Sequence, residues 1–405
     1  MLSVTRLLCG SATPGDSVRY GEVARHPQSI PSAGGVHRRP VVVWNITRRC
    51  NLLCIHCYAS ATDQAAPDEL STDEALEQVK DLADFGVPVV LFSGGEPLVR
   101  PDIFELMSSA ASQGVKPVLS TNGTLLTEDT VKQLVEAGVN RVGISLDGME
   151  STNDEFRGKV GAFQDALAGI RRCQDAGIRV SVRLTMARHN VDELDNLFDL
   201  VEQEGVPRFC VYHLAYAGRG RGLLPDDLDA DRRRRAVDTI FERTVDIHRR
   251  GKELEVLTVD NHADGAYLLL WARDHAPDRV PEIEHLLSRN GGNSSGTGIG
   301  CIDERGFVHP DQFWRTRTLG QVRERPFSAI WQDDSIPLLR QLRSRKSLLP
   351  KMCTTCQFLS VCNGNLRARA EAYSGDPWGE DPACYLTDEE IGVAAGLAPP
   401  PSGAG

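Results

Sequence analysis

Apolar stretches alternate with amphipathic stretches over more than half of the chain. The run "PVVVWNIT" at residues 40–47 is typical of a buried strand. The segment "STDEALEQVKDLADFG" at 71–86 has a capping Ser or Thr, apolar residues at helical spacing and a closing Gly86, which predicts a helix. This alternation continues to a helical segment at 232–251, as in a parallel sheet with right-handed crossovers. The six predicted strands occupy residues 40–47, 87–95, 116–123, 140–148, 178–186 and 207–218.

Polar residues follow several of these strands at the point where each strand ends. They lie in the segments 50–57, 93–96, 121–123 and 145–148. A doubly wound sheet and a partial barrel both fit the periodicity, but the carboxyl ends of strands converge on one active-site mouth in β/α barrels. We therefore predict an α/β fold: a partial (β/α)6 TIM-type barrel with a smaller C-terminal domain.

Composition and charge exclude several classes of partner. The chain has 405 residues, 25% of them charged, and a net charge of −11 without a basic tail or stripe, which argues against nucleic acid as a partner. No stretch approaches the roughly 18 to 20 consecutive apolar residues of a membrane span, and Arg6 interrupts the short apolar N-terminus, unlike a secretory signal. We expect a cytoplasmic protein that contacts neither nucleic acid nor membrane.

The eleven cysteines fall into two groups and four isolated positions. In a reducing compartment, clustered cysteine is more often metal-binding or catalytic than disulfide-bonded. Cys9, Cys173, Cys210 and Cys301 stand alone, whereas the groups contain Cys50, Cys54 and Cys57 near the N-terminus and Cys353, Cys356, Cys362 and Cys384 near the C-terminus.

The N-terminal group has the spacing C-x3-C-x2-C and no fourth cysteine nearby. Four-iron clusters normally take four thiolates, so a triplet indicates a cluster with one open iron that can bind a substrate or cofactor. The alternative is a zinc site that uses His56 as its fourth ligand. His56 is adjacent to Cys57 and is badly placed to close the same tetrahedron.

The three cysteines, the Tyr58 that follows them and "SGGEP" at residues 93–97 resemble the radical S-adenosylmethionine superfamily. The resemblance implies a [4Fe-4S] cluster whose open iron chelates S-adenosylmethionine, with Tyr58 against the adenine. It also implies that Gly94 and Gly95 let the backbone approach the cofactor's amino group, beside the charge of Glu96. Taken alone, Glu96 is equally well explained as a helix-capping carboxylate before Pro97.

Four further residues correspond to cofactor contacts of that family. Asn122 in "STNG" and Ser145 and Asp147 in "ISLDG" occupy strand ends where the family binds the methionine carboxylate and the ribose. Arg157 in "NDEFRG" resembles an arginine that pairs with the carboxylate. Because "NG" and "DG" are common turn dipeptides, Asn122 and Asp147 are also consistent with plain turns.

The C-terminal group has four thiols, enough to close a site completely. Such a site is structural zinc or a fully ligated cluster, and spacing leaves both open. The pattern C-x2-C-x5-C with a distant last cysteine resembles the auxiliary-cluster domains of radical S-adenosylmethionine enzymes. Leu366 stands where a two-cluster version would have another cysteine, so we expect one auxiliary [4Fe-4S] cluster and two clusters in all.

Segments from about residue 41 to 391 resemble the tetrapyrrole-tailoring branch of the superfamily, which contains 12,18-didecarboxysiroheme deacetylases and NirJ-like proteins of haem d1 biosynthesis. The blocks include "LTVDNHADG", "NGGNSSGTGIGCID" and "DPACYLTDEEIG". The resemblance implies an iron tetrapyrrole as substrate and a low-potential electron donor such as ferredoxin or flavodoxin. The carboxylates of such a substrate call for arginine side chains, for which Arg219 and Arg221 are candidates. His262 and His309 are weaker candidates for a contact with the substrate.

The resemblance also implies a reaction. Reductive cleavage of S-adenosylmethionine gives a 5′-deoxyadenosyl radical, which abstracts hydrogen from a side chain of the substrate. The haem d1 proteins tend to lack a cysteine at the position of Cys301. A thiol there could return a hydrogen atom to the substrate, so we favour deacetylation to an iron coproporphyrin. The alternative is that Cys301 is a buried core residue. Conversion of propionates to oxo groups for haem d1 remains open.

Two other classes remain as alternatives: a peptide maturase and a zinc-held scaffold. A maturase would usually have a leader-binding domain, for which the residues before the first strand are too few. We divide the chain into five parts: an N-terminal extension (1–39), a radical S-adenosylmethionine barrel (40–255), a linking segment (256–300), an auxiliary-cluster domain (301–391) and a flexible tail (392–405).

Overall fold

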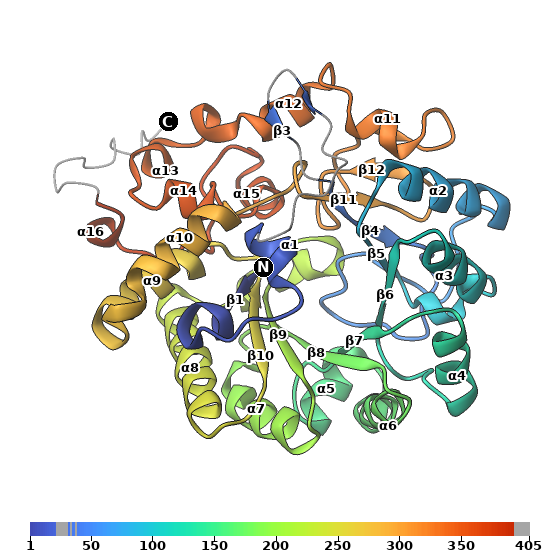
Figure 1. Ribbon diagram of the computed structural model, residues 1–405, viewed down its shortest axis with the longest axis horizontal. Coiled ribbons are helices and arrows are strands. Elements are labelled where there is room, and N and C mark those ends of the chain that lie inside the picture. Colours follow the sequence, from blue (N-terminus) through green and yellow to red (C-terminus); the bar gives the residue numbers. More distant parts are fainter. Residues whose placement is uncertain (22–30, 33–34, 37–38, 393–405) are drawn as a thin grey trace.

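One sheet runs through the centre of the molecule (Figure 1). The computed structural model describes residues 1–21, 31–32, 35–36 and 39–392, and within them this sheet has eleven strands in the order β1-β10-β9-β8-β7-β6-β5-β4-β11-β12-β13. The strands from β10 to β11 in this order run parallel to one another, and β1, β12 and β13 pair antiparallel at the two edges. The parallel strands are β4 (Val41–Asn45), β5 (Val89–Ser93), β6 (Lys116–Thr121), β7 (Arg141–Ser145), β8 (Arg179–Met186), β9 (Arg208–His213), β10 (Glu255–Val259) and β11 (Ile299–Ile302).

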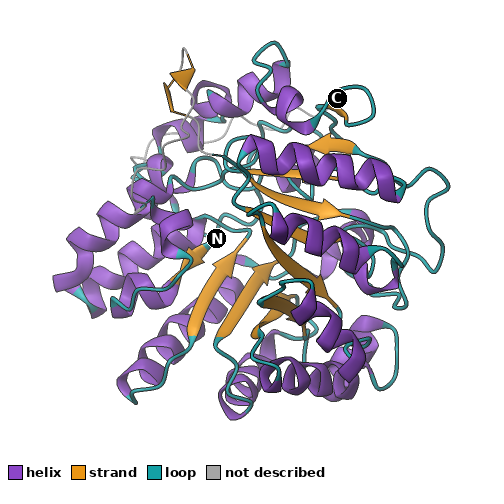
Figure 2. Cartoon of the chain, turned by 45° about the vertical axis from the view of Figure 1, so that its right-hand side comes forward, coloured by secondary structure: helices purple, strands orange, loops and turns teal. Residues whose placement is uncertain are grey.

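The remaining strands are short. They are β1 (Leu2–Ser3), β12 (Phe307–His309) and β13 (Gly320–Gln321) in the large sheet, and β2 (Pro31–Ser32) and β3 (Gly35–Val36), which pair with each other. All six predicted strands are present as β4 to β9, and the partial-barrel α/β fold is confirmed. The sheet curves without closing, with helices on its outer side (Figure 2).

Helices cover the outer side of the parallel strands and connect them in the predicted alternation. Ser71 caps the first of them in a capping box with Glu74, and Gly86 ends it in the left-handed conformation. These helices are α2 (Thr72–Phe85), α3 (Ile103–Ser112), α4 (Glu128–Glu136), α5 (Glu150–Arg157), α6 (Ala162–Asp175), α7 (Leu194–Gln203) and α8 (Ala230–Arg249).

The other helices belong to the two ends of the chain and pack beside the barrel in Figure 1. They are α1 (Asp16–Tyr20), α9 (Ala263–His275), α10 (Val280–Asn290), α11 (Phe327–Trp331), α12 (Pro337–Arg343), α13 (Lys351–Thr355), α14 (Leu359–Cys362), α15 (Arg367–Ser374) and α16 (Asp388–Ile391). A short π-helix occurs at η1 (Thr5–Cys9), and 3₁₀ helices occur at η2 (Pro97–Val99), η3 (Val191–Glu193), η4 (Gly218–Asp226), η5 (Pro277–Arg279) and η6 (Arg345–Leu348).

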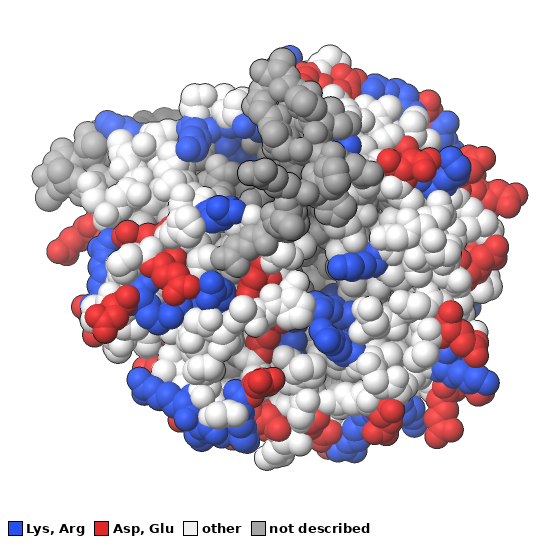
Figure 3. Space-filling view, viewed as in Figure 1, with Lys and Arg blue, Asp and Glu red and all other residues white. Residues whose placement is uncertain are grey.

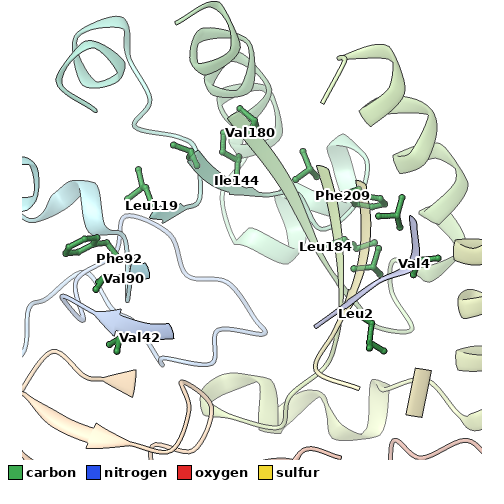
Figure 4. Close-up of a cluster of buried hydrophobic side chains, with 14 of the residues drawn as sticks. Leu2, Val4, Val42, Val90, Phe92, Leu119, Ile144, Val180, Leu184 and Phe209 are labelled. Carbon is green, nitrogen blue, oxygen red and sulfur yellow. The ribbon is translucent and has the colours of Figure 1, made fainter. Parts of the chain in front are cut away.

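The strands separate two environments by the alternation of their side chains. Successive side chains of a strand point to opposite faces, so Val42 and Phe92 join the core under the helices while Val43 and Leu91 line the inner side of the sheet. Figure 4 shows this core passing from strand to strand as far as Phe209. Burial of apolar surface holds the helices to the sheet, and the inner side is left for function.

The N-terminal segment, predicted as an extension of residues 1–39, contributes a strand to the sheet. Strand β1 pairs antiparallel with β10. The Thr5 hydroxyl donates to Leu254 O (3.0 Å) and accepts from Val256 N–H (2.9 Å), and Leu7 is fully buried in the main core. The first residues therefore cover the edge of β10 instead of preceding the fold.

The segment predicted to link two domains contains strand β10, helices α9 and α10 and the first residues of β11. The division at 255/256 therefore falls inside a strand that is hydrogen-bonded to β9. The other domain boundaries stay predictions, and the predicted tail lies, apart from its first residue, outside the described residues. Among the described residues no helix is long and apolar enough to cross a membrane, and basic and acidic side chains are intermingled on the face shown in Figure 3.

The N-terminal segment supplies a test of its structural role. Leu7→Ala should lower the free energy of unfolding by about 2–5 kcal/mol, because it opens a cavity in the core. The matched change Val18→Ala, at a side chain that is 47% exposed, should change it by no more than about 0.5 kcal/mol. Anaerobic urea unfolding followed by circular dichroism measures both, and equal effects would contradict the integration of this segment in the core.

Candidate active site

A pocket opens where the parallel strands end. Its walls come from the loop after β4, from the ends of β5 to β9, and from residues 260 and 312–313. Its empty volume of about 1120 Å³ includes open solvent at the mouth, so the pocket has room for more than one small ligand. The predicted site residues that line it are Cys50, Cys54, Cys57, Tyr58, Gly94, Gly95, Asn122, Ser145 and Arg157.

The three N-terminal cysteines lie on a loop whose backbone is fixed from several sides. Cys50 N–H donates to Thr62 O (2.6 Å), and Arg219 N–H donates to Cys57 O (2.9 Å). Backbone N–H groups of Leu52 and Ala61 also donate to the sulfur atoms of Cys50 and Cys57, each at 3.4 Å. Such donors favour thiolates, which are the cluster-binding form of cysteine.

Burial works against these thiolates in the absence of a metal. It raises the pKa of the Cys50 thiol to about 12 and also raises the pKa of Cys54. A positive partner is therefore needed to hold the sulfurs of Cys50 and Cys54 ionised. In the described part of the chain, no three His, Cys, Asp or Glu side chains converge closely enough to hold a single metal ion; in a cluster, by contrast, the thiolates bind several irons.

His56 is turned away from a shared metal site with these cysteines. Its Nε2 lies 3.3 Å from Asp147 Oδ2, and its ring stacks on Phe156 at 4.5 Å between centroids. Burial lowers the pKa of His56 to about 4. The geometry offers no support for the zinc site that would borrow His56.

Gly94 and Gly95 bring the end of β5 against the cysteine loop. Gly95 N–H donates to Thr47 O at 2.7 Å, and Glu96 N–H donates to Arg49 O at 2.9 Å. A Cβ on Gly95 would lie 2.1 Å from Arg49 O, and one on Gly94 would lie 2.5 Å from Thr47 O. Only glycine permits this approach, which leaves backbone at the pocket wall.

Glu96 does not line the pocket. Its buried carboxylate accepts from Leu98 N–H (3.2 Å), the Thr121 hydroxyl (2.7 Å) and Asn122 N–H (2.8 Å). The capping alternative is thus present in the structure, because Glu96 caps η2. Burial raises the pKa of Glu96 to about 7 against these donors, and the side chain acts here as a brace between β5 and β6.

Asn122 and Tyr58 both line the pocket. Asn122 Nδ2 donates to Asn51 Oδ1 at 2.8 Å and lies 4.0 Å from Cys50 Sγ. The Tyr58 hydroxyl donates to Asn45 Oδ1 at 2.9 Å and shares a hydrogen bond with Ser93 Oγ at 2.9 Å. Both side chains are held by protein partners, which presets their position for a ligand.

Arg157 lies beside the cysteines and is held by Asp147. The two residues form a buried ion pair, and Arg157 Nη1 lies 3.7 Å from Cys54 Sγ. Asp147 Oδ1 accepts from Thr185 N–H at 2.7 Å, and Asp147 does not line the pocket. Asp147 therefore positions Arg157 instead of facing the pocket itself. Arg157 Nε is buried without a hydrogen-bond partner in the described residues.

Cys301 lies in the middle of β11 and is fully buried. Its sulfur accepts from Asn45 Nδ2 at 3.6 Å, and Asn45 separates it from the Tyr58 hydroxyl. It is not among the residues that line the pocket. Its register partner on β4 is Val43, which lines the pocket, so Cys301 lies on the inner face of the sheet in contact with Asn45. Its role as a hydrogen-donating thiol stays a prediction, with a buried core residue as the alternative.

The four C-terminal cysteines lie on or after α13 and α14 and before α16. Burial, and then the thiols of Cys384 and Cys353, raises the pKa of Cys362 well above its usual value. The guanidinium of Arg367 is fully buried beside Cys353 and Cys362, and its Nε and Nη2 have no hydrogen-bond partner in the described residues. A buried cation with unused donors fits an anionic group bound between these sulfurs.

Other predicted contacts have structural partners. Arg219 lines the pocket, but its Nε and Nη1 bind backbone carbonyls of the cysteine loop. Arg221 is exposed and outside the pocket, whereas His309 bonds to Asp303 and Arg317 O. His262 is buried, does not line the pocket and leaves Nδ1 without a hydrogen-bond partner in the described residues.

Sequence reasoning missed pocket residues inside strands. Arg183 in β8 and His213 in β9 line the pocket, and Asp260 follows β10 there. Arg183 fits because Gly143 on the neighbouring strand lacks a Cβ, which would lie 2.2 Å from the guanidinium. Ionisable residues inside predicted strands, as in "IRVSVRLTM" and "CVYH", were the signal available.

Comparison with known proteins identifies the class. Residues 44–201 match the Radical SAM superfamily. Streptococcus suis SuiB bound to S-adenosylmethionine shares the fold with a TM-score of 0.68 at 21% identity, over 86% of this chain and 77% of its own.

Two relatives match over nearly the whole chain. "Fe-coproporphyrin III synthase" of Methanosarcina barkeri is 50% identical over 97% of this chain and 99% of its own. "Pre-heme d1 synthase" of Dinoroseobacter shibae is 43% identical over 93% of this chain and 94% of its own. The chain therefore belongs to the radical S-adenosylmethionine superfamily, whose enzymes use a four-iron cluster and S-adenosylmethionine.

The residues present fit this cofactor pair. Three thiols line the pocket, two of them with backbone N–H donors; glycines expose backbone beside them, and Arg157 has an unused buried donor. Cys50, Cys54 and Cys57 would hold the cluster, leaving one iron for the amino acid part of S-adenosylmethionine.

Gly95 tests the backbone contact on which this arrangement rests. Gly95→Ala should displace the cysteine loop by about 1 Å or more and lower the formation of 5′-deoxyadenosine about 100-fold. The control Gly222→Ala places a Cβ with nothing within 4 Å and should leave the rate unchanged. Chromatographic assay of 5′-deoxyadenosine under reducing conditions measures both, and a normal rate in Gly95→Ala would refute the steric account.

Proposed function

We propose that this enzyme removes acetate side chains from an iron tetrapyrrole derived from siroheme, 12,18-didecarboxysiroheme, to form an iron coproporphyrin. The observation that carries the proposal is the 50% identity, from end to end, with a protein named Fe-coproporphyrin III synthase. We place the reaction in the cytoplasm, where the cysteines, all free of disulfides in the structure, remain reduced.

The charges of the pocket support a substrate with several carboxylates. Arg183 Nε and Arg219 Nη2 are buried and have no hydrogen-bond partner in the described residues, and both side chains line the pocket. Arg183 Nη1 is anchored by the Ser120 hydroxyl at 2.6 Å. An arginine that is fixed by one nitrogen and keeps another free can bind a carboxylate without losing much side-chain entropy.

The protein's own residues perform the positioning. When bound, the cluster and S-adenosylmethionine supply one-electron chemistry that starts reaction at an unactivated carbon. Tyr58, held by Asn45 and Ser93, lines the wall where the adenine would lie. Arg157 is oriented by Asp147 for the methionine carboxylate. The backbone at Gly94 and Gly95 lies against the cysteine loop at separations that leave no room for a side chain.

We further propose that Cys353, Cys356, Cys362 and Cys384 hold one auxiliary [4Fe-4S] cluster. Buried Arg367, with two unused donors beside Cys353 and Cys362, supports an anionic group there. Leu366 is buried and donates its N–H to Asp381, so the position of a further cysteine is part of the packing. A low-potential donor such as ferredoxin or flavodoxin would reduce the N-terminal cluster.

Metal content distinguishes the two sites. The wild type should bind about eight irons, as two four-iron clusters, and Cys54→Ala should keep about four. Cys54→Ala should make no 5′-deoxyadenosine, because Cys50 and Cys57 alone leave the open cluster one thiolate short, while the four C-terminal thiols close their site completely. Iron and sulfide analysis after anaerobic reconstitution measures the iron content of both proteins. About four irons with one zinc in the wild type would instead assign structural metal to the C-terminal group.

The product mass tests the reaction. Anaerobic incubation with 12,18-didecarboxysiroheme, S-adenosylmethionine and a reductant should give a pigment that has lost two acetate-derived groups. Loss of propionate carbons with the acetate-derived methyl groups retained would place the enzyme with the pre-haem d1 synthases instead. Cys301→Ala should deacetylate at the wild-type rate, because the buried thiol lies outside the pocket; a stalled reaction would restore its role as a hydrogen donor.

A further inference from the structure

His213 is a pocket residue for which the cofactor gives no role. It ends β9 at the carboxyl side of the barrel, lines the pocket and is 3% exposed. Its Nε2 lies 2.9 Å from Oδ2 of buried Asp264 in α9. Within the described residues Nδ1 has no hydrogen-bond partner, so it is the ring nitrogen available to a ligand.

Asp264 is fixed on its other oxygen. The Tyr385 hydroxyl donates to Asp264 Oδ1 at 2.8 Å, and Tyr385 is itself buried and packs edge-on against Tyr267 at 5.6 Å. Asp264 thus accepts from both neighbours. A carboxylate that accepts from Nε2–H fixes the neutral tautomer with its lone pair on Nδ1.

This arrangement is the one that metal-binding histidines use. A histidine ligand usually donates its second ring N–H to a carboxylate, which orients the ring and raises its basicity. His56, which also lines the pocket, is turned to Asp147 beside the three thiols, whereas His213 belongs to a network on the β9 and α9 side. Arg183 and Arg219 suit the carboxylates of the proposed substrate. The imidazole of His213 suits the metal that this substrate carries.

We propose that His213 Nδ1 binds the iron of the tetrapyrrole substrate as an axial ligand, with Asp264 and Tyr385 as positioning residues. The inference rests on the proposed function. Coordination at the centre of the macrocycle fixes its plane while leaving the peripheral side chains to the rest of the pocket. Because Tyr385 directly follows Cys384, the same network joins the substrate pocket to the C-terminal thiols.

Binding spectra test the ligand without turnover. Ferric iron coproporphyrin III is titrated anaerobically into reconstituted wild type, His213→Ala, Asp264→Asn and the surface control His275→Ala, and followed by the Soret band and electron paramagnetic resonance. We expect the wild type and His275→Ala to give the same imidazole-ligated spectrum. His213→Ala should lose it and regain it with added imidazole, and Asp264→Asn should weaken binding about 10–100-fold with a shifted spectrum.

Two controls separate failure of this inference from failure of the function. Metal-free coproporphyrin III should bind wild type and His213→Ala equally, since it has no iron to coordinate. If His213→Ala binds the iron pigment with unchanged spectrum and affinity, the axial ligand is overturned while the proposed function stands. If the wild type neither binds the iron pigment nor converts 12,18-didecarboxysiroheme, the function is overturned and this inference with it.

Discussion

The active site depends on a close backbone contact between the end of β5 and the cysteine loop. Gly95 N–H and Glu96 N–H donate to the carbonyls of Thr47 and Arg49, and a Cβ on Gly94 or Gly95 would clash with these same carbonyls. This contact fixes the loop against the sheet, and with it the three thiols, the face of Tyr58 and the backbone beside them. The parallel sheet supplies the rigidity, because its strands are hydrogen-bonded on both sides up to that end.

Buried charge is the second organising feature. Asp147 is paired with Arg157 beside Cys54, and Asp264 accepts from His213 and Tyr385. In each pair the carboxylate lies behind the pocket and holds a cationic or imidazole group toward it. Burying an unpaired charge is costly. The unused donors of Arg157 and Arg367 therefore indicate where an anionic group binds.

Much of the fold followed from periodicity, and its limits have physical causes. Strands β4 to β9 were predictable because each couples an apolar run to an amphipathic helix. Strand β10 was not predicted, because the predicted strand–helix repeat ends with α8. Strand β1 was not predicted because it has two residues, and their pairing depends on a partner more than 250 positions away. The thiol groups and glycines were visible as motifs, since close spacing and small residues are local signals.

The roles of single polar side chains were harder to predict. Glu96 and Asp147 sit in recognisable motifs, yet their carboxylates point into the protein and brace neighbours. Cys301 was placed near the substrate by resemblance; it shares the inner face of the sheet with Val43, its register partner on β4, but it is fully buried there and does not line the pocket. His213 went unnoticed because its partner Asp264 is distant in sequence and meets it only in the folded chain.

The central claim is that one cysteine group leaves an iron open while the other closes its site. Electron paramagnetic resonance of the reduced, reconstituted enzyme, recorded before and after addition of S-adenosylmethionine, tests it directly. The account predicts two cluster signals, of which one shifts with S-adenosylmethionine and disappears in Cys54→Ala, while the other is unchanged by both. A single signal, or two signals that both respond to S-adenosylmethionine, would contradict it.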